Sequence, residues 1–268
     1  MLPVSNVLQV SNVLPVSNVL QVSNVVHSLV SALDRAGPDG FMQMLAKHDQ
    51  GYKSQIPALD PEDPKYYWIT KNIDFKEWWN GDSFRTLRLS GAPTGEMLKI
   101  SSYIIGMAGP VLYFCCPAAP KHQVWKICIQ ALLHQILKPL SHPEQIQAIK
   151  DFVHRLVDTI GGDETVLNRL SLEHGDGEIS TIRTLLGVST DNALLDALLT
   201  VQEIHPAPTV VIDGLDRVQD GNRVLVGRIH AFIERSGGKA LLTSVMQDDS
   251  KPSLKGMRYI EYDAERKG

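Results

Sequence analysis

Residues 86–107 read TLRLSGAPTGEMLKISSYIIGM and decide the fold of the chain. The first five, 86–90, form a short apolar run that predicts a buried strand. A turn with two glycines and a proline follows at 91–95, and residues 97–107 then have the apolar spacing of a helix. A strand joined to a helix by a glycine turn is a unit of parallel α/β sheets.

The rest of the chain continues this alternation of strands and helices. Further strands are predicted at 111–115, 209–212 and 240–244, and helices at 124–137, 143–160, 193–204 and 221–235. Residues 163–187 are polar and contain glycine, which indicates a loop or an insertion. Because alternating strands and helices build a parallel sheet covered on both faces, we predict a doubly wound, P-loop-type α/β fold with about five strands.

Three regions are predicted along the chain. Residues 1–26 repeat the hexad VSNVLP or VSNVLQ about four times, a low-complexity pattern that predicts a disordered or weakly helical extension. Residues 27–65 are predicted to hold short helices and a linker, and residues 66–268 the organised domain. Aromatic residues recur at nearly helical spacing between Tyr66 and Trp79, which predicts a core helix just before the first strand.

Composition argues against several classes of partner. The formal net charge is -4 and the chain has no Lys/Arg-rich run, so nucleic acid is not expected to bind. The three cysteines, two of them adjacent, predict no disulfide framework, which fits a cytoplasmic location. No charged residue precedes Asp34, and Ser-Asn pairs interrupt the apolar stretches before it, so neither a signal peptide nor a membrane span is predicted.

Four blocks of sequence, in order, resemble fungal NACHT domains of the NOD-like, or STAND, class. The blocks are YYWITKNIDFKEWW (66–79), RTLRLSGAPTGEMLKISSYII (85–105), VLYFCC (111–116), and PTVVIDGLDRV (208–218) with KALLTSV (239–245). The resemblance covers residues 66–245. It implies a nucleotide-dependent switch between an N-terminal effector and C-terminal repeats, with phosphates held by a loop that reads GxPGxGKT in such domains.

The loop departs from that pattern at every side chain that would hold a phosphate or magnesium. The residues aligned with it are Gly91, Ala92, Pro93, Thr94, Gly95, Glu96, Met97 and Leu98. Met97 replaces the lysine that reaches the phosphates, and Leu98 replaces the hydroxyl residue that binds Mg²⁺. Thr94 and Glu96 replace two glycines. We therefore expect no cofactor, or at most weak Mg-ATP or Mg-GTP binding.

The acidic strand and the sensor strand depart as well. By resemblance, Asp213 and Asp216 match the acidic residues near magnesium, a role they would have only if nucleotide binds. The alternative, which we favour, is that Asp213 caps the helix or turn after an apolar strand. Arg217 stands at the expected catalytic acid, and a guanidinium cannot act as the general base. Val245 replaces the sensor arginine. We expect no hydrolysis.

These departures predict a non-catalytic signalling or interaction domain, a pseudo-NTPase derived from a NACHT switch, with protein partners or self-association. One alternative is a nucleotide-binding NTPase switch that uses non-standard ligands. Another is a truncated gene product without selected activity, since the chain ends at Gly268. Resembling proteins continue there into winged-helix and repeat regions, which we expect this chain to lack.

Overall fold

The structure is a computed structural model, and it describes residues 24, 27, 30, 31, 33–35, 37–49, 63–81, 83–108, 111–117, 121–160, 184–203, 207–218, 222–245 and 256–262. The hexad repeat, apart from residue 24, and residues 163–183 of the predicted loop lie outside the described residues. Residues 184–188 are helical, so the loop prediction is wrong at 184–187. The reason is the apolar pair Leu185 and Leu186, whose side chains are buried in the core.

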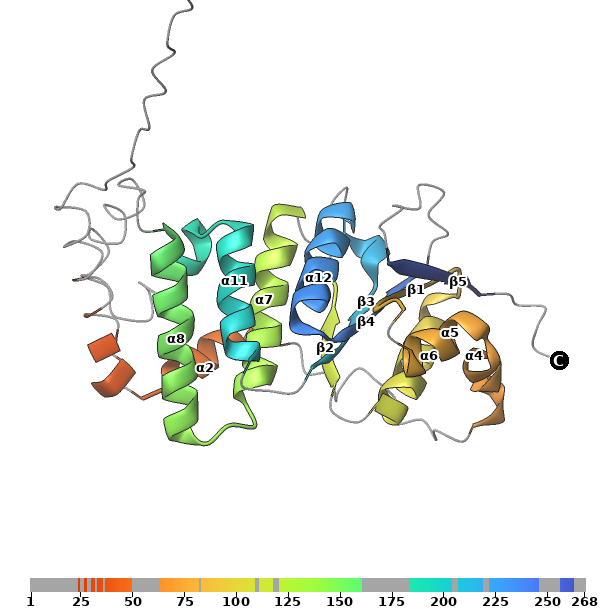
Figure 1. The fold of residues 1–268 in the computed structure, drawn as a ribbon, viewed down its shortest axis with the longest axis horizontal. Coiled ribbons are helices and arrows are strands. Elements are labelled where there is room, and N and C mark those ends of the chain that lie inside the picture. Colours follow the sequence, from red (N-terminus) through yellow and green to blue (C-terminus); the bar gives the residue numbers. More distant parts are fainter. Residues whose placement is uncertain are drawn as a thin grey trace, which may run out of the picture.

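Five parallel strands form one sheet in the order β2-β3-β4-β1-β5 (Figure 1). They are β1 (Thr86–Ser90), β2 (Val111–Cys115), β3 (Thr209–Asp213), β4 (Lys239–Ser244) and β5 (Met257–Glu261). The predicted α/β fold with about five parallel strands is confirmed. Strand β4 lies between β1 and β3, so the carboxyl ends of β1, β4 and β3 lie next to one another.

Helices cover both faces of the sheet (Figure 1). One face carries α4 (Tyr67–Lys71), α5 (Ile73–Asn80) and α6 (Thr94–Ala108). The other carries α7 (Lys121–Leu137) and α12 (Asn222–Ser236). Outside them, α11 (Asp191–Gln202) packs against α7 and α12, α8 (His142–Ile160) against α11, and α2 (Asp39–Ala46) against α7. Two short 3-10 turns, η1 (Pro64–Tyr66) and η2 (Leu215–Arg217), precede α4 and follow β3. Each sheet face therefore has its own hydrophobic core.

The aromatic segment before β1 is divided where the sequence predicted one helix. Asn72 interrupts it with an extended backbone, and its side chain accepts a hydrogen bond of 3.2 Å from the Phe75 N–H. A side-chain oxygen in this position satisfies a free N–H of the first helical turn and so starts a new helix. Phe75 and Trp78 are buried in the core, as predicted.

No helix in the described part of the chain is long and apolar enough to cross a membrane.

Candidate functional site

The predicted phosphate loop is a turn of only three residues. Strand β1 ends at Ser90 and α6 begins at Thr94, so five of the eight aligned residues, Thr94 to Leu98, belong to the helix. Gly91 has a φ of 91°, a conformation that favours glycine, and its N–H bonds the Ser244 carbonyl of β4 at 3.2 Å. Within α6, the N–H groups of residues 96 and 97 donate to the Pro93 carbonyl at 2.9 and 2.8 Å. These two N–H groups are used by the helix, whereas an open loop would offer them to phosphate.

Met97 points into the protein. Its side chain, at the position where the resemblance expects the phosphate lysine, is 2% exposed and belongs to the core between α6 and the sheet. Ala92 in the turn is also fully buried in this core, with Leu89 and Ile100. The side-chain position that should reach a ligand therefore stabilises the α6–sheet contact by apolar burial.

Glu96 is held by a cation from the segment before the sheet. The Lys65 ammonium lies 2.9 Å from one carboxylate oxygen of Glu96 and donates to the other at 3.2 Å. The Glu96 side chain is 13% exposed and that of Lys65 41%. The hydrogen bond to Glu96 raises the pKa of Lys65. The rings of Tyr66 and Tyr103, with centroids 5.3 Å apart, join η1 to α6 beside this pair.

A carboxylate in the first turn of α6 has a second physical effect. The amino end of a helix carries a partial positive charge and attracts anions, phosphate among them. Glu96 supplies a negative charge from the chain itself, and Lys65 adds the nearby positive charge. The partial positive charge of the helix end and the ammonium of Lys65, which would otherwise attract phosphate, are thus both offset by Glu96.

Asp213 at the end of β3 is buried and bonded by two hydroxyl groups. Its Oδ1 accepts hydrogen bonds from the Thr243 hydroxyl of β4 and, at 3.5 Å, from the Ser101 hydroxyl of α6. Burial raises the pKa of the Asp213 carboxyl, and these hydrogen bonds oppose that rise. Sequence reasoning missed both hydroxyl residues, although a buried carboxylate does need donors. Ser101 lies one helical turn beyond Leu98, where the resemblance expects a hydroxyl.

The side chain of Asp216 contacts the backbone of Val245. The Asp216 Oδ1 accepts a hydrogen bond of 2.8 Å from the Val245 N–H just after β4. The predicted second metal ligand therefore fixes the turn that leaves the sensor strand. The sensor position contributes a backbone donor to this contact.

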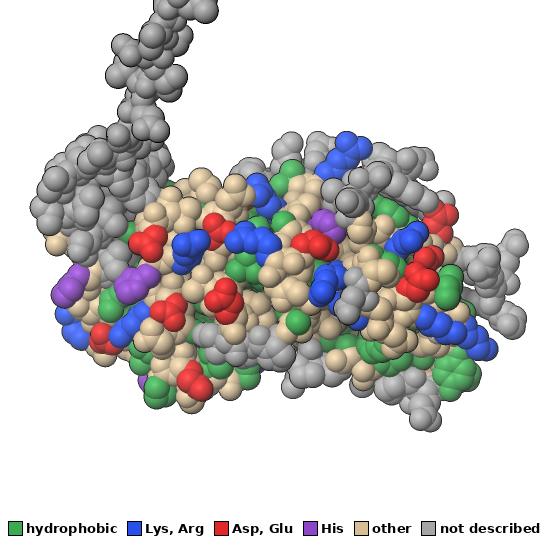
Figure 2. Space-filling view, viewed as in Figure 1, with side chains coloured by type: hydrophobic (Ala, Val, Ile, Leu, Met, Phe, Trp, Pro, Cys, Tyr) green, Lys and Arg blue, Asp and Glu red, His purple; other side chains and the backbone are tan. Residues whose placement is uncertain are grey.

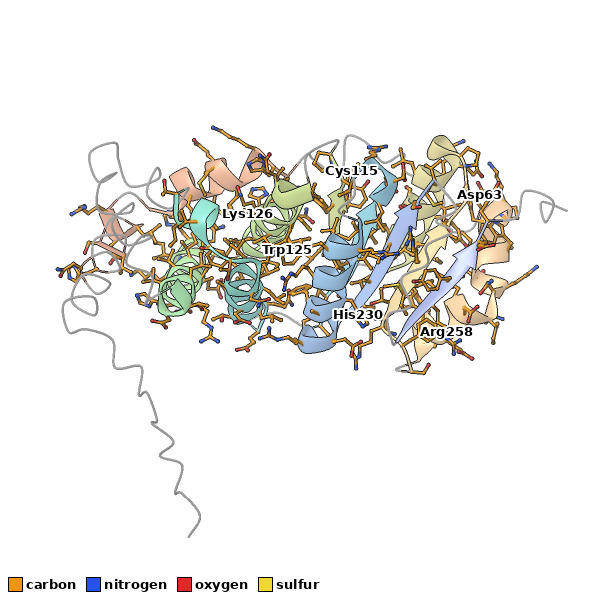
Figure 3. The ribbon with its side chains drawn as sticks, turned by 90° about the horizontal axis from the view of Figure 1, so that it is seen from above. Asp63, Cys115, Trp125, Lys126, His230 and Arg258 are labelled. Atoms are coloured by element: carbon orange, nitrogen blue, oxygen red, sulfur yellow. The ribbon has the colours of Figure 1, made fainter. Side chains whose placement is uncertain are left out.

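Arg217 contacts the end of strand β2. Its Nη1 donates to the Cys115 Sγ at 3.3 Å, and Gly214, with a φ of 75°, makes the turn between β3 and η2. Cys115 pairs with Asp213 in the register of β2 and β3. Burial and the negative charge of Asp213 raise the pKa of the Cys115 thiol, against the opposing effect of Arg217. Cys115 and Arg258, both labelled in Figure 3, belong to β2 and β5, the strands at the two opposite edges of the sheet.

The structure thus brings together most of the residues singled out from the sequence at the carboxyl ends of the parallel strands. Asp213, Asp216, Arg217 and Val245 lie beside the turn after β1, as the strand order requires. Among the residues that the structure describes, no group of three or more His, Cys, Asp or Glu side chains could hold a metal ion. Two carboxylates remain, and Mg²⁺ bound by so few usually needs phosphate oxygens as well.

Comparison with known proteins identified no relatives: no protein-family model, curated protein or solved structure matches the chain.

Proposed function

We propose that this chain is a non-catalytic signalling or interaction domain derived from a NACHT-type nucleotide switch. Its phosphate loop has become a structural turn. The observation that carries the proposal is the burial of Met97 within a helix that already begins at Thr94. Met97 supplies no cation for phosphate, and the N–H groups of Gly91, Glu96 and Met97 are already bonded within the protein.

The charged residues near the carboxyl ends of the strands support the same proposal. Glu96 is paired with Lys65, Asp213 is bonded by two hydroxyls, and Arg217 occupies the position of the catalytic acid. An attacking water would need a carboxylate to orient it, and a guanidinium cannot accept its proton. The domain therefore works without turnover.

The proposed partners are proteins, including further copies of this chain, in the cytosol. Figure 2 shows acidic and basic side chains interspersed over the face in view, without a continuous basic field there. Nucleic-acid binding depends on such a field. Free thiols at Cys115, Cys116 and Cys128 suit a reducing compartment.

A nucleotide-binding switch with non-standard ligands is the second candidate. The observation in its favour is the pair of hydroxyl groups, Ser101 and Thr243, on the Asp213 carboxylate. A hydroxyl beside an acidic strand end is the ligand type that Mg²⁺ uses in P-loop sites. The hydroxyl of Ser101, however, is buried together with Asp213 and already donates to its carboxylate.

Sedimentation velocity of the purified chain, over a range of concentrations and with or without Mg-ATP, tests the proposal. A nucleotide-independent interaction domain gives the same distribution of species in both buffers. A switch changes its assembly when nucleotide is added. A shift that Mg-ATP produces and an Asp213→Ala variant lacks would favour the second candidate.

A further inference from the structure

Strand β2 is at one end of the sheet, and an edge strand has backbone groups that the sheet does not satisfy. The N–H of Cys116 donates to the Asp213 carbonyl of β3 at 2.8 Å. Because alternate residues of a strand bond the same neighbour, Tyr113 directs its N–H and its carbonyl away from β3, toward the outer edge. These two groups need a partner other than a strand.

The side-chain amide of Gln135 on α7 supplies that partner. Its Oε1 accepts from the Tyr113 N–H at 2.8 Å, and its Nε2 donates to the Tyr113 carbonyl at 2.7 Å. One amide group therefore makes the pair of bonds that a sixth strand would make at this residue. The arrangement needs the amide in one orientation, because a flipped amide would oppose donor to donor and acceptor to acceptor.

Asp49 reinforces that orientation. The Nε2 of Gln135 also donates to Asp49 Oδ1 at 3.1 Å, and the other carboxylate oxygen lies 2.5 Å from the Nδ1 of His134. A carboxylate only accepts hydrogen bonds, so it holds the NH₂ end of the amide toward itself and leaves Oε1 facing Tyr113. The side chains of His134 and Asp49 are 11% and 12% exposed, so little water competes.

Asp49 belongs to the N-terminal segment, residues 33–49, which packs on the domain through side chains. It follows α2, whose Phe41 and Leu45 are buried in the same core as α7. At a separate point, the Asp34 carboxylate of this segment meets the Lys150 ammonium of α8 at 2.5 Å. The carboxylate on Gln135 is therefore present only while the segment stays docked.

We propose that Asp49 is a latch through which residues 33–49 control edge strand β2. With the segment docked, Asp49 orients Gln135, Gln135 closes the edge at Tyr113, and the strand holds Cys115 at the candidate site. With the segment released, the amide of Gln135 is held by Tyr113 alone, and the edge opens more often at Tyr113. A protein that binds the N-terminal segment would thus change the exposure of the Cys115 thiol.

Hydrogen exchange at single amides of the full chain, followed by NMR, tests the latch. In Asp49→Ala, exchange of the Tyr113 N–H is expected to rise about tenfold, the effect of weakening one hydrogen bond. The amide of Leu242 in central strand β4 is expected to keep its rate. Alkylation of Cys115 is expected to become several-fold faster in the same variant. Gln135→Ala, which removes the edge partner itself, should raise Tyr113 exchange at least as much.

Asp34→Ala is the matched control. It removes a carboxylate of the same segment that pairs with Lys150 of α8, whereas the described hydrogen-bond partners of Gln135 are Tyr113 and Asp49. It should leave Tyr113 exchange within about twofold. Unchanged Tyr113 exchange in Asp49→Ala would overturn the latch, because Gln135 would then close the edge alone. An equal rise at Tyr113 and Leu242 would also overturn it, since the effect would be global unfolding.

Discussion

Replacing Met97 with lysine distinguishes an open phosphate loop from the closed turn described above. Lysine is the residue that the NACHT resemblance requires at this position. In an open loop the ammonium would lie in solvent, and the free energy of unfolding would change by less than about 0.5 kcal/mol, as for ordinary surface substitutions. In this structure the Met97 side chain is 2% exposed, so the introduced ammonium would be buried or would force the turn apart.

The size of the destabilisation follows from the cost of removing a proton from the introduced lysine. A lysine buried without a partner avoids the larger cost of a buried charge by losing its proton. At pH 7 this costs about 4.6 kcal/mol for an ordinary pKa near 10.4, at about 1.36 kcal/mol per unit. Lost methionine packing adds roughly 1 kcal/mol. The total of about 5 to 6 kcal/mol is comparable with the whole stability of a small domain, about 5 to 15 kcal/mol.

Urea unfolding at pH 7 and at pH 10 measures this loss of unfolding free energy and the direction in which it changes with pH. Burial depresses the pKa of the introduced lysine in the folded state only. The destabilisation is therefore large at pH 7 and shrinks as the pH approaches the unfolded pKa, leaving about 1 to 2 kcal/mol at pH 10. The matched control is Leu98→Lys, because Leu98 is only half-buried and should show a smaller loss with little pH dependence. A Met97→Lys variant within about 1 kcal/mol of the unmodified chain at pH 7 would refute the closed turn.

Three further outcomes are expected. Burial raises the pKa of Asp213 above its ordinary 3.8, so the stability linked to its protonated form is lost as the pH rises through the raised value. Asp213→Asn should therefore be more stable than the unmodified chain at pH 7, and this advantage should shrink near pH 4. Urea midpoints of both proteins across this pH range measure the difference. Deleting residues 1–26 should leave the melting temperature unchanged and improve solubility, because the Val-rich repeat has no obvious docking face; a large drop in melting temperature would contradict this. Phosphate release from ATP or GTP with Mg²⁺ or Mn²⁺ should stay at background because Arg217 stands where the resemblance expects the general base, and turnover abolished by Asp213→Ala would overturn the pseudo-NTPase proposal.

The sequence was most informative where apolar runs stand between turn residues. Strands β1 to β4 could be located because each is a short apolar or β-branched run bounded by glycine, proline or polar residues. Strand β5 could not, because MRYIE exposes Arg258 and Glu261 and is too short for its alternation to be distinctive. An edge strand has this composition because it needs to be buried less.

The start of α6 was placed three residues late, at Met97. The two glycines near Pro93 indicate a turn, yet the helix begins at Thr94, where Pro93 provides the first backbone acceptor. The contacts of Asp213 were beyond sequence reasoning for a different reason. Its hydroxyl partners, Thr243 and Ser101, are 30 and 112 residues away and meet it only through the strand order.

Calorimetric titration of the purified chain with Mg-ATP and with Mg-GTP tests the central claim most directly. Loss of the lysine–phosphate contact alone costs about 1.5 to 3 kcal/mol, which weakens binding roughly 10- to 100-fold, and the closed turn weakens it further. We expect no binding by the unmodified chain. We also expect none by the variant with Glu96→Gly, Met97→Lys and Leu98→Thr together, because restoring side chains does not reopen a turn of three residues. Micromolar binding by the unmodified chain would contradict the account, and binding gained by the triple variant would show that the loop backbone is still able to hold phosphate.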